Sequence, residues 1–153
     1  MVDPLGPSIL LILFLFFAAC VYMASIALPS VDEAEYRKSA SQGVSSARRT
    51  LRMLHRFDNG YGELRLTYQI LITASYICLW NIVGEALKAL TGLSTTPCAI
   101  ILLLAYEIVS FTVTAIIPSG FAAHSPDKTM NAISLFAELA VSVCSVVTWP
   151  AVQ

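Results

Sequence analysis

The chain has 153 residues, of which 57% are hydrophobic and 12% are charged; its formal net charge is -1 and its mean hydropathy is +0.74. Charged residues make up about a quarter of an ordinary soluble domain, so this composition excludes that class and indicates one integral membrane domain over residues 1–153. Seven of the nine basic residues lie between the first two apolar stretches: Arg37, Lys38, Arg48, Arg49, Arg52, Arg56 and Arg65.

A helix needs about 20 residues to cross the hydrocarbon core of a membrane, and four apolar stretches are about this long. They are residues 5–28, 66–84, 99–118 and 130–150. The first two contain no charged residue, the third contains Glu107 and the fourth contains Glu138. We predict that the first three span the membrane. A carboxylate in the fourth would be costly if it faced lipid, so we expect this segment to lie in or re-enter the cytoplasmic interface, with a full span as the alternative.

The basic connection between the first two stretches indicates the orientation, because short loops rich in Lys and Arg stay cytoplasmic. Residues 31–65 are therefore expected inside, with the N-terminus and the turn at 92–97 outside. The third stretch then returns to the cytoplasm near Pro118. The expected location is the plasma (inner) membrane.

Residues 31–56 are predicted to form two amphipathic helices on the cytoplasmic surface, because four arginines in the second half recur at helical spacing. Ser30 is a candidate N-cap of the first helix. Gly43 is expected to divide the two, with Ser45 or Ser46 capping the second. The basic residues either attract anionic lipid head groups, at about 1 kcal/mol per residue near the surface, or serve only as a topology signal.

The end of the third stretch combines a proline, a glycine and small hydroxylated residues between Ile116 and Pro126. This pattern predicts a helix that is broken at Pro118. A broken helix frees backbone groups, which are tolerated in a membrane only where they face protein or a water-filled cavity. Such breaks often mark ion or substrate sites.

The sequence offers no catalytic pattern. It contains no GxSxG, HExxH or phosphate-loop motif, and its four cysteines are scattered without a CxxC pair. We therefore expect neither an enzyme nor a nucleic-acid partner. Glu107 is a separate functional candidate, because a carboxylate inside a membrane is rarely without a role.

Four features occur in an order typical of one family. They are the run ending in Ser-Ile-Ala-Leu at 25–28, the basic stretch at 47–54, two further apolar runs, and Ile-Ile-Pro at 116–118 leading into residues 122–128. This order resembles the transmembrane domain of the CNNM/CorC (cyclin M, hemolysin-C-like) divalent-cation transporters over nearly the whole chain. The resemblance implies an all-α integral membrane fold with three spanning helices, cytoplasmic interfacial helices, a homodimer and a magnesium site near the third helix.

The ligand motifs of that family are only partly present. Its Ser-Glu pattern falls on positions 24–25, its Gly-Asn-Thr pattern on 73–75 and its Gly-Glu pattern on 114–115, so that its carboxylate and its amide are both missing. The remaining oxygen donors would be neutral hydroxyls and backbone carbonyls. The resulting candidate metal-site residues are Ser25, Thr73, Ser75, Thr114, Ala115 and Pro118.

A magnesium site with only neutral ligands would be weak, because Mg²⁺ demands hard oxygen ligands and a buried divalent charge needs compensation. Glu107 does not supply it, since it precedes Ala115 by eight residues, which is about 12 Å along a helix. Besides Mg²⁺ no cofactor is expected. The cytosolic CBS tandem that usually follows in the family is not among the 153 residues, so ATP regulation is not expected of them.

Two functions follow from the sequence. The first is a divergent transmembrane module of a CNNM/CorC-like transporter of magnesium or another divalent cation. The second is a non-transporting interaction or regulatory subunit that has lost the ion site and pairs with a paralogue. A third, weaker hypothesis is that these residues are an N-terminal part of a longer protein. The expected partners are the lipid bilayer and a second chain, with small residues of the first run, such as Ala18 and Ala24, forming the contact.

Overall fold

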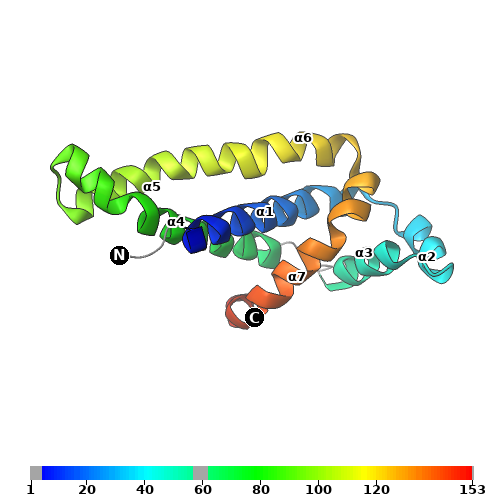
Figure 1. The fold of residues 1–153 in the computed structure, drawn as a ribbon. Helices are drawn as coiled ribbons and strands as arrows, with labels where there is room; N and C mark the ends of the chain where they lie inside the picture. The colour runs from blue at the N-terminus through cyan, green and yellow to red at the C-terminus, as the bar shows by residue number, and fades with distance from the viewer. Residues whose placement is uncertain (1–4, 57–61, 153) are drawn as a thin grey trace.

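The computed structural model describes residues 5–56 and 62–152, and all regular elements in these ranges are helical (Figure 1). Residues 57–61, which belong to the predicted cytoplasmic connection, and residues 1–4 and 153 lie outside the described residues. The elements are α1 (Leu5–Ala27), the 3-10 turn η1 (Leu28–Ser30), α2 (Glu33–Ser41), α3 (Ser45–Arg56), α4 (Gly62–Thr91), α5 (Thr95–Phe111), the π-helical segment η2 (Thr112–Ile116), α6 (Ile117–His124) and α7 (Pro126–Val152).

Three helical segments of the described chain are long and apolar enough to cross a membrane: Leu5–Ser30, Gly62–Thr91 and Thr95–His124. They confirm the predicted all-α architecture with three spanning helices. Each is longer than the apolar stretch that predicted it. In α4, for example, Lys88 and Glu85 form an ion pair at 2.8 Å one turn apart. The helix ends at Thr91 and is followed by Gly92, whose positive φ of 70° suits glycine.

The third spanning helix is not broken at Pro118, so that prediction is wrong. The N–H of Ile117 donates to the carbonyl of Thr112, five residues back, which widens the helix just before the proline. A wider turn makes room for a ring that would clash with the preceding turn of an α-helix. The chain leaves the helix at Ser125 instead, where a residue before a proline is disfavoured in helical conformation.

Helices α2 and α3 form as predicted, although their ends differ. Asp32, rather than Ser30, caps α2 by accepting a 3.0 Å hydrogen bond from the N–H of Ala34. Gly43 divides the two helices with a φ of 91°. Helix α3 begins at Ser45, which places Ser45 inside the first turn rather than at the cap.

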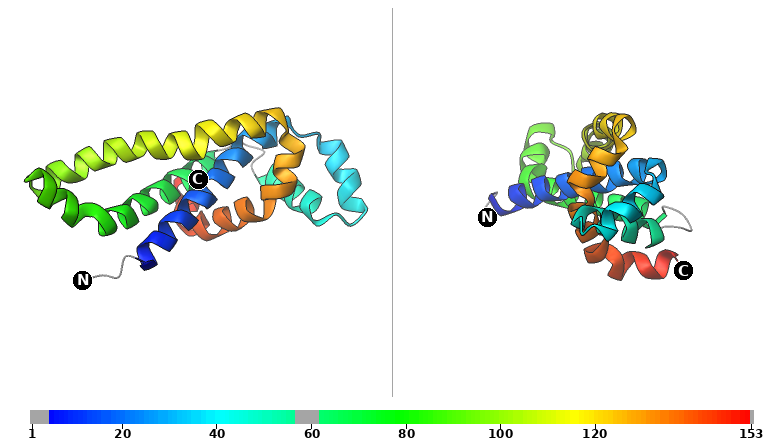
Figure 2. Two further views of the ribbon diagram at one scale, coloured as in Figure 1. Left: turned by 45° about the horizontal axis from the view of Figure 1, so that its top comes forward. Right: turned by 90° about the vertical axis from the view of Figure 1, so that its right-hand side faces the viewer.

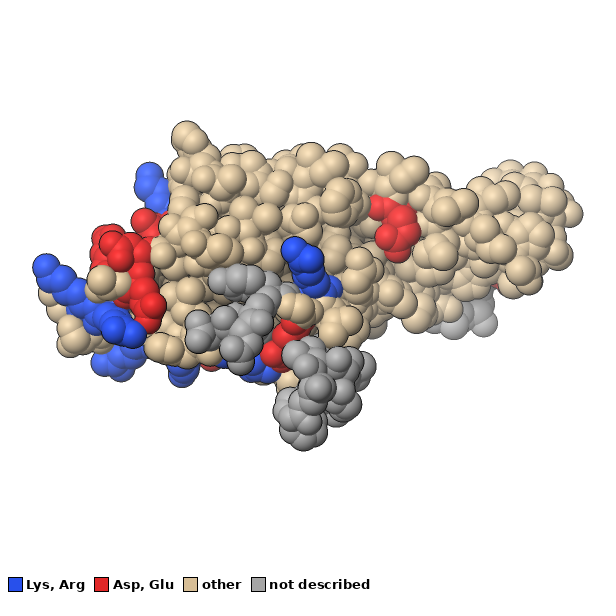
Figure 3. All heavy atoms as spheres, turned by 180° about the vertical axis from the view of Figure 1, so that it is seen from behind, with Lys and Arg blue, Asp and Glu red and all other residues tan. Residues whose placement is uncertain are grey.

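Charged side chains gather at the end of the molecule that α2 and α3 form, which we call the basic end. The last turn of α1, the end of α6 and the start of α7 lie at this end, while the α4–α5 connection lies at the other (Figures 1 and 2). Figure 3 shows Lys, Arg, Asp and Glu concentrated there on one face, with a mostly uncharged surface beyond. This separation suits a helix bundle in lipid with one end among polar head groups.

Helix α1 is the centre of the bundle and packs on α4, α6 and α7. Its small residues Ala18, Ala24 and Ala27 are fully buried within the chain. Small side chains allow close helix approach in lipid, and here they serve packing inside one chain. The expected use of Ala18 and Ala24 in a contact with a second chain is therefore corrected.

Helix α7 lies beside α3 and crosses α1 obliquely (Figures 1 and 2). Ser46 donates to Asn131 at 3.3 Å, Arg49 to Ser134 at 3.3 Å, and Arg52 to Glu138 at 3.2 Å. The partners keep a nearly constant sequence separation, so the two helices run parallel. Glu138 thus pairs with a basic residue of the basic end, and the interfacial placement of the fourth apolar segment stays a prediction.

Candidate functional site

Two pairs of buried hydroxyls join α4 to the third spanning helix. The Tyr68 hydroxyl lies 2.8 Å from Thr114 Oγ1, and the Tyr106 hydroxyl lies 2.6 Å from Ser75 Oγ. Thr114 already donates to the carbonyl of Ser110 and Ser75 to that of Ile72, each at 2.6 Å. Each tyrosine is therefore the donor of its pair. Hydrogen bonds of this kind hold membrane helices together.

The predicted metal-site residues do not line one common cavity in the described part of the chain. Ser75, Thr114 and Ala115 are buried, and the two hydroxyls are engaged with tyrosines. Thr73 is exposed on the outer side of α4, so its hydroxyl points away from them. Pro118 is half-buried in the first turn of α6.

Ser25 lines a cavity of about 360 Å³ between α1, α4 and the end of α5. The lining residues are Tyr22, Ser25, Ile26, Pro29, Leu64, Arg65, Tyr68, Gln69 and Phe111. Aromatic contacts close it on one side, since the Tyr22 ring centroid lies 5.2 Å from that of Tyr68 and 6.1 Å from that of Phe111. Of the predicted metal-site residues, only Ser25 is part of this lining.

The charge of the cavity opposes a divalent cation. Arg65 contributes a permanent positive charge, and none of the lining residues is acidic. Like charges repel, although solvent weakens this repulsion because Arg65 is exposed. Protein sites for Mg²⁺ usually supply one or two carboxylates. Within residues 5–56 and 62–152, no group of three His, Cys, Asp or Glu side chains is placed to hold a metal. The residues present do not fit a tightly held Mg²⁺.

Several polar residues of the spanning helices face outward. Gln69 and Thr73 share an exposed face of α4, as their spacing predicted, and Asn81 and Glu85 are exposed farther along the same helix. Glu107 is exposed on α5 and has no ion-pair partner among the described residues. Polar groups on a spanning helix are costly in contact with lipid, so they indicate a face that meets another protein or water.

Arg65, Tyr68 and Tyr106 are not among the site residues that the sequence predicted. A signal was present, because Tyr68 and Ser75 lie seven residues apart, as residues on one helix face do. Tyr106 and Ser110 are likewise four apart. Both tyrosines lie in apolar stretches and were counted there as hydrophobic residues. Arg65 was counted only as part of the basic connection, although it lies in the first turn of α4.

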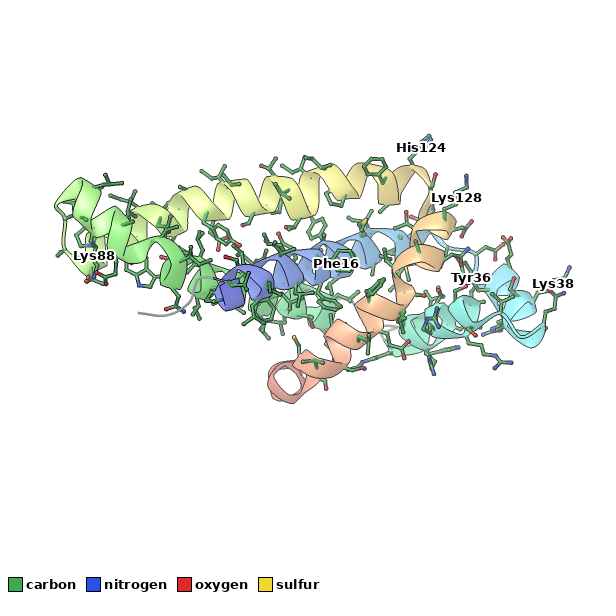
Figure 4. The ribbon with its side chains drawn as sticks, in the orientation of Figure 1. Phe16, Tyr36, Lys38, Lys88, His124 and Lys128 are labelled. Atoms are coloured by element: carbon green, nitrogen blue, oxygen red, sulfur yellow. The ribbon has the colours of Figure 1, made fainter. Side chains whose placement is uncertain are left out.

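Tyr36 fixes the interfacial helices to α7. It is buried, and its hydroxyl donates to the carbonyl of Asp127 at 3.2 Å (Figure 4). Burial first, and then the nearby Asp127 carboxylate, raise the pKa of Tyr36 to about 12. The phenol therefore stays neutral at any physiological pH and keeps its role as a donor.

Comparison with known protein families gives one finding. Residues 9–153 match the family model described as the cyclin M transmembrane N-terminal domain (CNNM). No curated protein matches the chain.

Proposed function

The chain belongs to the CNNM family of cyclin M transmembrane N-terminal domains, and from this premise we propose that it serves divalent-cation transport as a subunit that does not itself hold the ion. It would act in the plasma membrane, with its N-terminus outside, by pairing with a second chain. The family is associated with the transport of divalent cations. The role proposed for this member is the interaction or regulatory one.

The observation that carries this proposal is Arg65 in the cavity beside Ser25. A guanidinium is charged at every relevant pH and has no acceptor atom, so it cannot act as a ligand. The oxygen donors of the cavity side chains are the hydroxyls of Ser25 and the tyrosines and the amide of Gln69. All of them are neutral, and neutral oxygens alone poorly offset the cost of removing water from Mg²⁺. The cavity therefore favours loss of cation binding over an altered but working site.

The outward polar groups of α4 and α5 supply the second argument. Gln69 and Thr73 lie exposed on one face, and Glu107 lies exposed on the neighbouring spanning helix. A partner chain that covers these groups would remove their contact with lipid. The partner would be a second copy or a paralogue that carries the family's carboxylate.

One observation favours a second function, transport by this chain alone. The π-helical segment η2 begins directly after Phe111, which lines the cavity. Single-turn π segments are frequent at functional sites, because they shift backbone groups out of the regular pattern. In this alternative the oxygen ligands are the Ser25 hydroxyl and backbone carbonyls, and magnesium binding is weak.

Reconstitution separates these functions. The chain is placed in liposomes that contain a magnesium-sensitive dye, alone or together with a complete CNNM transmembrane domain. We expect no Mg²⁺ entry above that of empty liposomes for the chain alone. We also expect the two chains to copurify, and the flux per complete domain to change when this chain is present.

A variant pair tests the interaction face. Thr73→Leu changes the exposed face of α4 without altering the cavity lining and should reduce copurification. Ser142→Ala, at an exposed position of α7, is the matched control and should not. Mg²⁺ entry with the chain alone would establish the second function, and absence of both entry and copurification would overturn both.

A further inference from the structure

A second hollow, separate from the Ser25 cavity, lies where α6 and the start of α7 meet α1. Its volume is about 760 Å³. We call it the α6–α7 groove. It is lined by Met23, Ile117, Gly120, Phe121, His124, Ser125, Lys128, Thr129, Ala132 and Ile133. None of these residues lines the Ser25 cavity or belongs to the outward polar face of α4 and α5.

The floor of the α6–α7 groove is apolar. Met23 comes from α1, Ile117 and Phe121 from α6, and Ile133 from α7. Phe121 is 69% exposed and Ile117 is 56% exposed, so this floor is open rather than covered by the chain itself. An exposed apolar surface of this kind suits a hydrocarbon chain.

The rim of the groove is basic. His124 lies in the last turn of α6 and Lys128 in the first turn of α7, and Figure 4 shows both at the same corner of the molecule. Lys128 forms no ion pair with an acidic residue in the described part of the chain. Its neighbour Asp127 lines a different hollow with Tyr36 and Asn131.

We propose that the α6–α7 groove holds one anionic phospholipid of the leaflet at the basic end. Its phosphate would accept hydrogen bonds from Lys128 and His124, and the dipole of α7 favours an anion at that helix start. Its acyl chain would lie along Phe121 and Ile133. The occupant is a lipid rather than a soluble anion, because a soluble anion would leave the open apolar floor uncovered, whereas an amphiphile covers the floor and pairs with the basic rim.

The location supports this occupant. The groove lies at the end of the third spanning helix. Figure 1 shows that the chain passes into α7 there, at the basic end. Head groups lie at this level of a spanning helix. A phospholipid there would fill the angle between α6 and α7 and fix the start of the fourth apolar segment at the interface.

The test measures lipid retention by the purified full chain. The chain is exchanged into detergent with phosphatidylserine or phosphatidylcholine of identical acyl chains, and bound lipid is counted by native mass spectrometry. We expect one phosphatidylserine per chain and little phosphatidylcholine. Lys128→Gln should lower retention roughly fivefold, the effect of one basic residue near a membrane surface, and adding His124→Gln should lower it further.

Lys38→Gln is the matched control, because Lys38 is an exposed lysine of α2 that does not line the groove. It should leave retention unchanged, whereas Phe121→Ala should weaken binding of the acyl chain without altering charge. Circular dichroism checks that each variant is folded. The proposal would be overturned if both lipids were retained equally or if Lys128→Gln and Lys38→Gln had equal effects. It would also be overturned if millimolar inorganic phosphate fully displaced the bound phosphatidylserine.

Discussion

Replacing Thr114 by valine should destabilise the protein more than removing the hydroxyl of its partner Tyr68. Both residues are buried. Thr114→Val leaves the Tyr68 hydroxyl without an acceptor, and an unpaired buried donor costs about 1–3 kcal/mol. Tyr68→Phe removes the donor, but Thr114 keeps its 2.6 Å bond to the Ser110 carbonyl, so the loss is about 0.6 kcal/mol, as for an average hydrogen bond between membrane helices.

Thermal unfolding of the purified chain in mild detergent measures this asymmetry. At about 2–4 °C per kcal/mol, we expect Thr114→Val to lower the melting temperature by about 2–12 °C and Tyr68→Phe by about 1–2 °C. The double variant should lose less than the sum, because no donor is then left unpaired. Thr112→Val is the matched control, since Thr112 is exposed in the same π-helical segment, and it should change stability by less than about 0.5 kcal/mol.

Equal losses for Thr114→Val and Thr112→Val, or strictly additive losses in the double variant, would refute the reasoning. The same variants examine the role of Thr114 as a metal ligand. Tyr68→Phe frees an acceptor position on the Thr114 oxygen. If this oxygen held Mg²⁺, the variant should gain Mg²⁺-dependent stabilisation, and we expect none.

Three further predictions concern topology, pH and charge. A reporter fused after Arg56 should be cytoplasmic and one after Leu93 external; the reverse would refute the orientation. The parent should lose stability above pH 10, and Tyr36→Phe should remove this loss. A phenol has a pKa near 10 in the unfolded chain, but the pKa of Tyr36 is about 12 in the folded protein. The contribution of Tyr36 to folding stability is therefore complete below pH 10 and falls as the pH rises to 12. Arg65→Glu should raise Mg²⁺ binding, measured by calorimetry, by roughly tenfold or more through reversal of the cavity charge, whereas Arg48→Glu on α3 should not.

Hydropathy predicted the helices well, because a spanning segment must satisfy its backbone hydrogen bonds internally and therefore be helical. The helix ends were less predictable. Residues 85–91 extend α4 beyond the apolar stretch, and the Lys88–Glu85 ion pair lies within this extension. At Pro118 the sequence pattern predicted a break. The helix continues instead, because the hydrogen bond from Ile117 to Thr112 widens the turn before the proline. Such a register change depends on packing against α1, which one sequence does not reveal.

The candidate site could be predicted only in part. Alignment to family motifs named Ser25, which lines a cavity at the end of α1, and its role as a ligand stays a prediction. It could not reveal that Ser75 and Thr114 are engaged by tyrosines from the facing helix. That pairing depends on the register between α4 and the third spanning helix. The charge of the cavity was hidden for the same reason, since Arg65 enters it only through the way α4 packs on α1.

Glu107 and Glu138 are lone carboxylates of two similar apolar stretches, but their surroundings differ. Glu138 pairs with Arg52 at 3.2 Å, whereas Glu107 is exposed with no ion-pair partner in the part of the chain that the structure describes. A carboxylate without a partner is more costly in lipid than one in an ion pair. We therefore expect a second chain to cover the face of α5 around Glu107 rather than the surface around Glu138. We expect cysteines introduced next to Glu107 to crosslink between chains in membranes, and Glu107→Gln to weaken this crosslinking. Efficient crosslinking at Val143, an exposed position of α7, and none at α5 would place the contact elsewhere and contradict this reasoning.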